Sequence, residues 1–270
     1  MSRKEPSRAQ PEFSYFEIQS YWGVTKHMGG LRATDELAAL CHIDRSSYVL
    51  EVGCGVGVTS CQLARRTGCR LLGVDISDKM VEWARQRARR RSLEQLLEFR
   101  TADAQDLPFE TDRFDAVICE SVTAFPPDQQ RAVNEYARVT RPGGYVGLNE
   151  GTWLKAPPGD LVEYIARTMA NARFQDPQSW QALLENAGLQ DTIAVTHPIN
   201  ALTQRLDEMQ GLDAHDLLDR LRAIGSLVGL LVRNADFRRY AREITPSRSI
   251  IRNLFAHLGY GIYVGRKPPR

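Results

Sequence analysis

A glycine-rich loop between an apolar run and a helix-like segment is the first feature of this sequence that suggests chemistry. The stretch LEVGCGVGVTS, residues 50–60, has glycine at positions 53, 55 and 57, and Glu51 lies two residues before the first of them. A phosphate-binding P-loop requires a lysine after its last glycine, and none follows Gly57. A dinucleotide-binding GxGxxG loop requires glycine or alanine at its sixth position, which Val58 occupies. The sequence therefore argues against both of these phosphate-binding loops.

The carboxylate of Glu51 favours a ligand with a positively charged group. An ammonium group suits this carboxylate, and the backbone N–H groups at the start of the next helix, residues 57–59, suit a carboxylate. A ligand with both groups is a zwitterionic amino acid, such as the methionine part of S-adenosylmethionine. Asp75, at the end of the next apolar run, is placed to bind ribose hydroxyls. Asp103, after a third run, is placed to accept from an adenine amino group, and the backbone N–H of Ala104 can face the ring.

The elements that must position these residues alternate between strands and helices from Tyr48 to Gly147. The predicted strands are YVLEVG, RLLGVDIS, LEFRTAD, FDAVICES and YVGLNEG, and the predicted helices are TSCQLARRTG, SDKMVEWARQRARRRSL and PDQQRAVNEYARVT. Ser77 or Asp78 is expected to cap the second helix, and RPGG (residues 141–144) to end the third helix in a turn. Strands separated by helices of about 10–15 residues predict a doubly wound α/β fold with a mostly parallel sheet. Ligands bind at the carboxyl ends of strands in such a sheet.

The C-terminal half is expected to continue this sheet and to add a helical cap. A helix and strand are predicted in SWQALLENAGLQDTIAVTH, and the chain ends in the strand-like run LGYGIYVGRKPP. Helical patterns without a strand signal lie between them. We therefore expect a seven-stranded, Rossmann-like sheet with an N-terminal helical lid at 1–46, a binding domain at 47–200, a helical cap at 201–257 inserted before the last strand, and that strand with its tail at 258–270.

Five motifs in order resemble those of class I S-adenosylmethionine-dependent methyltransferases: VLEVGCGVG, GVDIS, ADAQDLPF, FDAVICES and RPGGYV. The likeness spans Tyr48 to Gly151 and is nearest to the small-molecule branch that includes quinone-biosynthesis and sterol-type enzymes. It implies that the cofactor is S-adenosylmethionine, and that Glu120 and Ser121 lie beside its methionine and methyl groups. The full set of residues that we expect to bind this cofactor is Glu51, Gly53, Cys54, Gly55, Gly57, Asp75, Ile76, Ala102, Asp103, Ala104, Glu120 and Ser121.

Methyl transfer from a sulfonium group is an in-line displacement, and an oxygen or carbon acceptor must also lose a proton. His27 is the first candidate for the base and Glu120 the second, while His197 and His257 are alternatives in the cap region. Tyr21, in the segment SYWGVTKHMGG, is a further catalytic candidate because aromatic faces attract cations. A packed N-terminal helix with buried aromatic side chains is the structural alternative for this segment.

The cap is expected to select the acceptor. Its segment LLDRLRAIGSLVGLLV and the nearby aromatic residues can line an apolar cleft, which predicts a small, apolar or lipid-like acceptor. The same apolar face suits a homodimer interface equally well, and the sequence leaves both interpretations open. Five cysteines without a CxxC pair predict neither a metal site nor a disulfide framework. An arsenite methyltransferase requires several thiols that converge at the site, and it is disfavoured because Cys54 lies within the glycine motif and Cys119 on the fourth predicted strand.

Composition narrows the range of partners. The chain has 35 lysines and arginines against 33 aspartates and glutamates, a net charge of +2, which argues against a nucleic-acid partner. The basic run RQRARRRS at 85–92 lies on a predicted helix away from the strand ends. No signal-peptide pattern or membrane-spanning run occurs, so we expect a cytoplasmic protein. Two alternatives stay open: an RNA or protein methyltransferase, although no NPPY-type tetrapeptide follows the fourth strand, and a non-catalytic S-adenosylmethionine-binding module.

Overall fold

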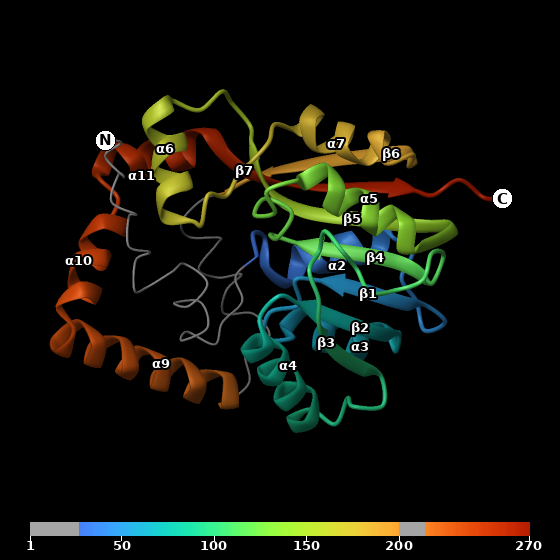
Figure 1. Cartoon of the computed structure of the whole chain (residues 1–270), viewed down its shortest axis with the longest axis horizontal. Helices are drawn as coiled ribbons and strands as arrows, with labels where there is room; N and C mark the ends of the chain where they lie inside the picture. The colour runs from blue at the N-terminus through green and yellow to red at the C-terminus, as the bar shows by residue number, and fades with distance from the viewer. Residues whose placement is uncertain (1–26, 200–213) are drawn as a thin grey trace, which may run out of the picture.

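The computed structural model describes residues 27–199 and 214–270, which form a doubly wound α/β fold around one sheet (Figure 1). The strand order is β3-β2-β1-β4-β5-β7-β6, and β7 runs antiparallel to both of its neighbours while the other pairs are parallel. The predicted mostly parallel, seven-stranded sheet is confirmed. The strands are β1 (Tyr48–Val52), β2 (Arg70–Asp75), β3 (Leu97–Thr101), β4 (Phe114–Glu120), β5 (Thr140–Trp153), β6 (Gln190–Pro198) and β7 (Leu258–Arg266).

Helices cover both faces of the sheet and bury a hydrophobic core on each. One core includes residues of α2, α3 and α4, and the other includes residues of α5, α6 and α7. Because both faces are covered, the central strands are largely buried, as are four of the five residues of β1. The helices are α2 (Gly30–Leu40), α3 (Val58–Thr67), α4 (Asp78–Arg90), α5 (Gln129–Val139), α6 (Gly159–Thr168), α7 (Pro177–Asn186), α9 (Ala214–Arg233), α10 (Ala235–Ile244) and α11 (Arg248–His257).

The order of the strands reverses at β1. This strand pairs with β2 on one side and with β4 on the other, so the crossovers that follow it leave in opposite directions. The carboxyl ends of β1 and β4 therefore border the crevice in which doubly wound sheets bind their ligands. The glycine loop of the sequence follows β1, and Glu120 is the last residue of β4.

Side-chain caps place the helices next to this crevice. The Ser77 side chain accepts a hydrogen bond from the backbone N–H of Met80 at the start of α4, as predicted, and Asp128 accepts from Arg131 at the start of α5. Helix α3 ends at Gly68, whose φ of 75° lies in the left-handed region. These local signals are the reason that the helix positions could be read from the sequence.

The predicted turn at RPGG is wrong in detail, because these residues belong to a strand. Helix α5 ends at Val139, and β5 begins immediately at Thr140. The backbone of Gly143 and Gly144 pairs with Lys267, just beyond the end of β7, through N···O distances of 2.9 and 2.8 Å. This long-range pairing extends β5 through the glycines, and a register shift in the β4–β5 pairing accommodates them.

Two helices that the sequence analysis did not delimit matter for the site. Helix α6 follows Pro157 and Pro158, and it buries Leu161 and Ile165 at helical spacing. Helix α2, which the sequence analysis assigned to an N-terminal lid, packs against α3, β5 and β7 with Leu37 fully buried. The catalytic candidate Tyr21 lies outside the described residues.

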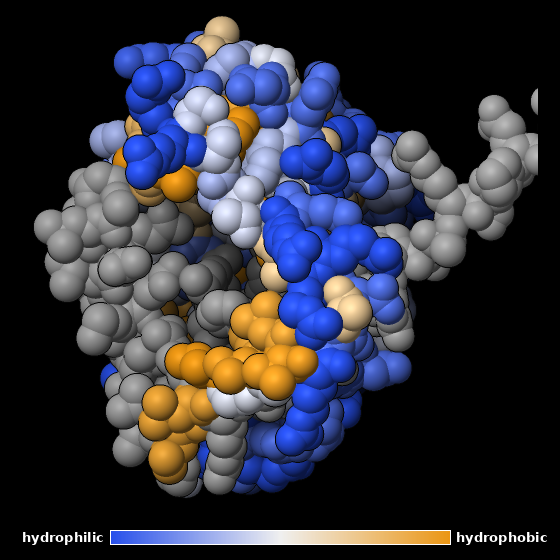
Figure 2. All heavy atoms as spheres, turned by 90° about the vertical axis from the view of Figure 1, so that its left-hand side faces the viewer, coloured by the Kyte–Doolittle hydropathy of each residue, from blue (hydrophilic) through white to orange (hydrophobic). Residues whose placement is uncertain are grey.

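Helices α9, α10 and α11 lie between β6 and β7 in the chain, where the cap was expected. Figure 1 shows them as an arc on the side of the sheet toward which β1 points. Figure 2, viewed from that side, shows hydrophobic residues gathered in its lower part. None of the helices in the described residues is long and apolar enough to cross a membrane. Among the side chains of α9 that the structure describes, the exposed large apolar ones are Leu218, Leu221, Ile224, Val228, Leu231 and Val232.

Candidate active site

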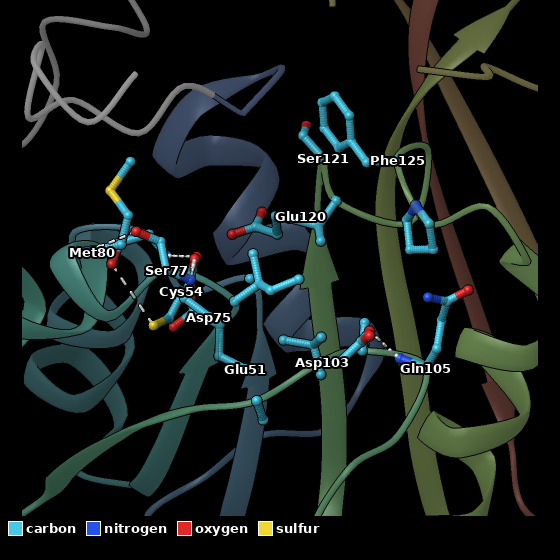
Figure 3. Close-up of a pocket in the computed structure, with 18 of the residues that line it drawn as sticks. Glu51, Cys54, Asp75, Ser77, Met80, Asp103, Gln105, Glu120, Ser121 and Phe125 are labelled. Carbon is cyan, nitrogen blue, oxygen red and sulfur yellow. Dashed lines mark hydrogen bonds between the residues drawn. The ribbon is translucent and has the colours of Figure 1, made fainter. Parts of the chain in front are cut away.

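A cavity of about 270 Å³ opens at the carboxyl ends of β1, β2 and β4 (Figure 3). The structure brings most of the sequence-predicted site residues together around it. Those that line it are His27, Glu51, Gly53, Cys54, Gly55, Asp75, Ile76, Ala102, Asp103, Ala104, Glu120 and Ser121. The lining residues that the sequence analysis did not select are Val52, Thr59, Ser77, Met80, Gln105, Val122, Phe125, Pro126 and Pro127.

The glycine loop lets the backbone turn sharply under this cavity. Gly53 has a φ of 77°, and a Cβ at this position would lie 2.2 Å from a methyl carbon of Val122. Gly57, in contrast, is not among the lining residues. It precedes α3 with a φ of 76°, its N–H donates to the carbonyl of Cys54 at 2.9 Å, and it packs against Ala84. Gly57 therefore shapes the loop and allows the start of α3 to pack closely against α4.

Glu51 is buried at the end of β1, with 3% of its surface exposed. The Ser60 hydroxyl of α3 donates a hydrogen bond to its carboxyl group. Burial raises the pKa of Glu51 to about 8, and the negative charges of Glu120 and Asp75 add to this effect while the Ser60 hydrogen bond opposes it. The Glu51 carboxyl is thus a group that a positively charged ligand would stabilise in its ionised form.

The two aspartates after β2 and β3 already make hydrogen bonds within the chain. Asp75 accepts from the backbone N–H groups of Gly55 and Ser77, each at 2.9 Å, and burial raises its pKa. Asp103 accepts from the N–H of Gln105 at 2.8 Å, the turn that was the structural alternative for this residue. Both side chains still line the cavity, so these bonds fix their orientation at its wall.

Glu120 is held by side chains from three other elements. The Thr34 hydroxyl of α2 donates to both of its carboxylate oxygens at 3.1 and 3.0 Å. The Thr59 hydroxyl donates at 2.7 Å, and the Asn149 side-chain amide donates at 3.1 Å. Nε2 of His27 lies 3.8 Å from Oε1 of Glu120 and 3.1 Å from the Thr34 hydroxyl. Glu120 therefore joins α2, α3 and β5 at the floor of the cavity.

Ser121 begins the segment that follows β4. Its φ of 58° is in the left-handed region, and its N–H donates to the carbonyl of Asn149 at 2.7 Å. Within the part of the chain that the structure describes, its buried hydroxyl has no hydrogen-bond partner. A buried hydroxyl at the wall of a cavity without a partner is a group that a ligand can satisfy.

The charges around the cavity agree with a cationic ligand. The carboxyl groups of Glu51, Asp75 and Glu120 all line it, and no lysine or arginine is among the described lining residues. The negative charges of Glu120 and Asp75 help to raise the pKa of Glu51, and a bound positive charge would offset this repulsion. The residues present thus fit a ligand with ammonium and sulfonium groups and with hydroxyls for Ser121 and Asp75.

Comparison with known proteins agrees with this fit. A family described as "Methyltransferase domain" matches residues 50–148. GfsG, a methyltransferase of Streptomyces halstedii, is 34% identical over 59% of this chain and 59% of its own length. The 27-O-demethylrifamycin SV methyltransferase of Amycolatopsis mediterranei is 28% identical over 99% of this chain and 100% of its own. Residues 50–148 form a class I S-adenosylmethionine-dependent methyltransferase domain of the small-molecule branch.

A solved structure supports the fold of this methyltransferase domain. The phosphoethanolamine N-methyltransferase 2 of Haemonchus contortus, determined in complex with S-adenosyl-L-methionine, superposes with a TM-score of 0.67 at 17% identity. The match covers 94% of this chain and 57% of that protein. At this identity the likeness establishes the fold, and together with the methyltransferase family match it supports S-adenosylmethionine as the cofactor.

The residues that hold Glu120 and His27 were not selected from the sequence. Thr34 and Asn149 lie 86 and 29 residues from Glu120 along the chain, and neither belongs to a recognisable motif. The alternative bases are not among the residues that line the cavity. His197 pairs with Glu36 at 3.1 Å, and His257 lies at the end of α11.

The first prediction concerns the glycine loop. An alanine in the left-handed region costs about 1–2 kcal/mol. Gly53→Ala should lower the free energy of unfolding by more than this, because the new Cβ would also clash with Val122. Gly188→Ala is a matched control, since Gly188 has a φ of 81° and open space around its Cβ position. Urea unfolding of both variants and calorimetric titration with S-adenosylmethionine measure the difference. Equal losses of stability in both variants would contradict the contact with Val122.

The second prediction concerns Glu51 and pH. The folded protein retains the Glu51 proton up to a pKa of about 8, whereas the unfolded chain loses it near 4.5. The stability of the cofactor-free protein should therefore fall as pH rises through this interval, by at most about 1.4 kcal/mol per pH unit for one such group. Glu51→Gln should flatten the profile, and Glu98→Gln, at an exposed position of β3, should not. Unfolding free energies between pH 5 and 8 test this, and identical slopes for Glu51→Gln and the wild type would refute it.

Proposed function

We propose that this protein transfers the methyl group of S-adenosylmethionine to a hydroxyl oxygen of a largely apolar small molecule, with His27 as the base. The observation that carries the proposal is that His27 and Glu120 line the same cavity as the predicted cofactor residues, and that the Thr34 hydroxyl contacts both of them. The relative that matches over the full chain is named for a methylated oxygen, which supports an oxygen acceptor.

Hydrogen bonding assigns a role to each nitrogen of His27. The Thr34 hydroxyl has one proton, which it donates to Glu120, so its oxygen can accept a hydrogen bond from Nε2 of His27. The neutral imidazole then carries its proton on Nε2, and Nδ1 is the atom that can take a proton from an acceptor hydroxyl. The imidazolium that results lies 3.8 Å from a Glu120 oxygen, whose negative charge stabilises it. Glu120 and Thr34 therefore position the base.

The other residues that line this cavity are proposed to bind the cofactor. Glu51 would hold the ammonium group, Asp75 the ribose hydroxyls, and Asp103 with the N–H of Ala104 the adenine. Bound S-adenosylmethionine supplies an electrophilic methyl group on a positively charged sulfur that becomes neutral during transfer. Apolar lining residues such as Val122 exclude water from the site, which favours that loss of charge.

The acceptor is proposed to contact the apolar face of α9. Among the side chains of α9 that the structure describes, the exposed aliphatic ones range from 41% exposed at Leu231 to 71% at Val232, and the helix lies on the side of the sheet toward which β1 points (Figure 1). Such a surface stabilises an apolar ligand at about 25 cal/mol for each Å² removed from water. A homodimer interface through the same face is the competing interpretation, and the fourth prediction separates the two.

The third prediction tests the base. His27→Ala should lower kcat about 10²–10⁴-fold at neutral pH, because it removes the proton acceptor, while cofactor affinity changes little. Glu120→Gln should lower kcat less, because it removes the negative charge that stabilises the imidazolium but leaves the proton acceptor in place. His197→Ala should retain the wild-type rate, since His197 pairs with Glu36 outside the cavity.

Rates are measured with labelled S-adenosylmethionine and a panel of hydroxyl-bearing apolar acceptors, with mass spectrometry of the product. A methyl group found on carbon or nitrogen would contradict the proposed acceptor atom. A wild-type rate in His27→Ala would reject His27 as the base.

The fourth prediction tests the surface of α9. Leu221→Gln and Val228→Gln should each raise the acceptor KM about tenfold and leave cofactor affinity unchanged, because they remove apolar contacts with the acceptor only. Ile193→Gln, at an exposed position of β6, is the matched control. Light scattering on the same variants reports the mass, and dissociation of a dimer without a change in KM would identify the face as a subunit interface.

A further inference from the structure

One wall of the cavity is a segment with no helix or strand of its own. We call residues 121–127, between β4 and α5, the wall loop. The members of this loop that line the cavity are Ser121, Val122, Phe125, Pro126 and Pro127. The two prolines have no N–H group, so they cannot take part in a regular backbone ladder. The shape of the wall loop must therefore be imposed by other parts of the chain.

The beginning of the wall loop is held by β5. The N–H groups of Val122 and Thr123 both donate to Oε1 of Glu150, at 3.0 and 2.7 Å, and the Glu150 side chain is fully buried. The N–H of Ser121 donates to the Asn149 carbonyl in the same strand. Burial raises the pKa of Glu150 to about 7, and the two backbone donors oppose that rise because they favour the ionised carboxylate.

The end of the wall loop is held by Arg173, which lies between α6 and α7. One guanidinium nitrogen, Nη2, donates to the carbonyl of Pro126 at 2.8 Å and to that of Pro127 at 2.6 Å. The backbone N–H of Arg173 donates to the carbonyl of Ala124 at 2.9 Å. The side chain itself is exposed and is not among the residues that line the cavity.

Arg173 is in turn fixed to the sheet. Its carbonyl accepts from the side-chain amide of Gln129 at 2.9 Å. The ring of the next residue, Phe174, contacts the Trp153 ring at the end of β5 edge to face, and it fills the space over Gly151. The backbone carbonyl of Gln175 accepts a hydrogen bond from the backbone N–H of Trp153 at 2.9 Å. The guanidinium group thus transmits the position of β5 to the far end of the wall loop.

We propose that Arg173 is a positioning residue for cofactor binding, which it supports by holding the Pro126 and Pro127 carbonyls so that the wall loop stays closed on the cavity. The proposal rests on the proposed function in one respect, namely that this cavity holds S-adenosylmethionine. Charge-assisted hydrogen bonds to two consecutive carbonyls cannot be replaced by a neutral side chain, and the prolines offer no other polar group to anchor. The wall should open and the cofactor should dissociate faster when the guanidinium is removed.

The experiment compares Arg173→Gln with Arg138→Gln. Arg138 makes the same kind of contact, to the carbonyls of Phe109 and Leu107 at 2.7 and 2.9 Å, but neither of these residues lines the cavity. Calorimetric titration and stopped-flow dissociation with S-adenosylmethionine and S-adenosylhomocysteine give the affinities and rates, and thermal unfolding gives Tm. Arg173→Gln should weaken cofactor binding about tenfold, mainly through faster dissociation. Arg138→Gln should lower Tm at least as much and leave the affinity within twofold.

Arg173→Lys completes the test, because it retains the charge and should recover part of the affinity lost in Arg173→Gln. Wild-type affinity in Arg173→Gln would overturn the positioning role. Equal losses of affinity in Arg173→Gln and Arg138→Gln would also overturn it, since the effect would then follow from general stability. If the wild-type protein binds neither cofactor form, the proposed function fails instead, and the two failures are thereby distinguished.

Discussion

The buried carboxylate of Glu120 is the constraint on which the arrangement of this site depends. A carboxylate that is 7% exposed must be compensated by donors, since an unpaired buried charge is strongly destabilising. Thr34, Thr59 and Asn149 supply those donors from α2, α3 and β5. Satisfying this one group therefore fixes helix α2 against the sheet, and with it the position of His27. Removing any donor would affect both the packing of α2 and the position of His27, the proposed base.

The residues proposed to bind the cofactor also have structural roles. Each carboxylate oxygen of Asp75 accepts a hydrogen bond from a backbone N–H group, one from Gly55 and the other from Ser77, and these bonds shape the glycine loop. Each carboxylate oxygen has two lone pairs, so these bonds leave acceptor capacity for a hydroxyl in the cavity. Structural and binding roles are therefore compatible for Asp75, and Asp103 combines a turn with a place at the cavity wall in the same way.

The sequence predicted those parts of the structure that local pattern determines. The glycine spacing, Ser77 as a cap and the alternation of strands and helices depend on neighbouring residues, and they place Asp75 at a strand end without knowledge of distant contacts. Contacts between segments that are distant along the chain could not be predicted from such local patterns. Thr34 meets Glu120 across 86 residues, and Lys267 draws the glycines of RPGG into β5 across more than a hundred. Threonine, asparagine and arginine at such positions carry no pattern until the fold brings them to a partner.

The cofactor cavity and the region proposed to contact the acceptor are formed by different parts of the chain. Strands β1 to β4 supply the glycine loop and the carboxylates, within the segment that matches the methyltransferase family. Helices α9 to α11 enter between β6 and the antiparallel β7, outside that segment. Strand β5 spans both regions, since it pairs with β4 and β7 and carries Asn149 and Glu150 beside the site. If α9 to α11 contact the acceptor as proposed, substitutions in these helices can alter acceptor selection without disturbing the cofactor cavity, provided that the end of β5 keeps its contacts with Glu120 and the wall loop.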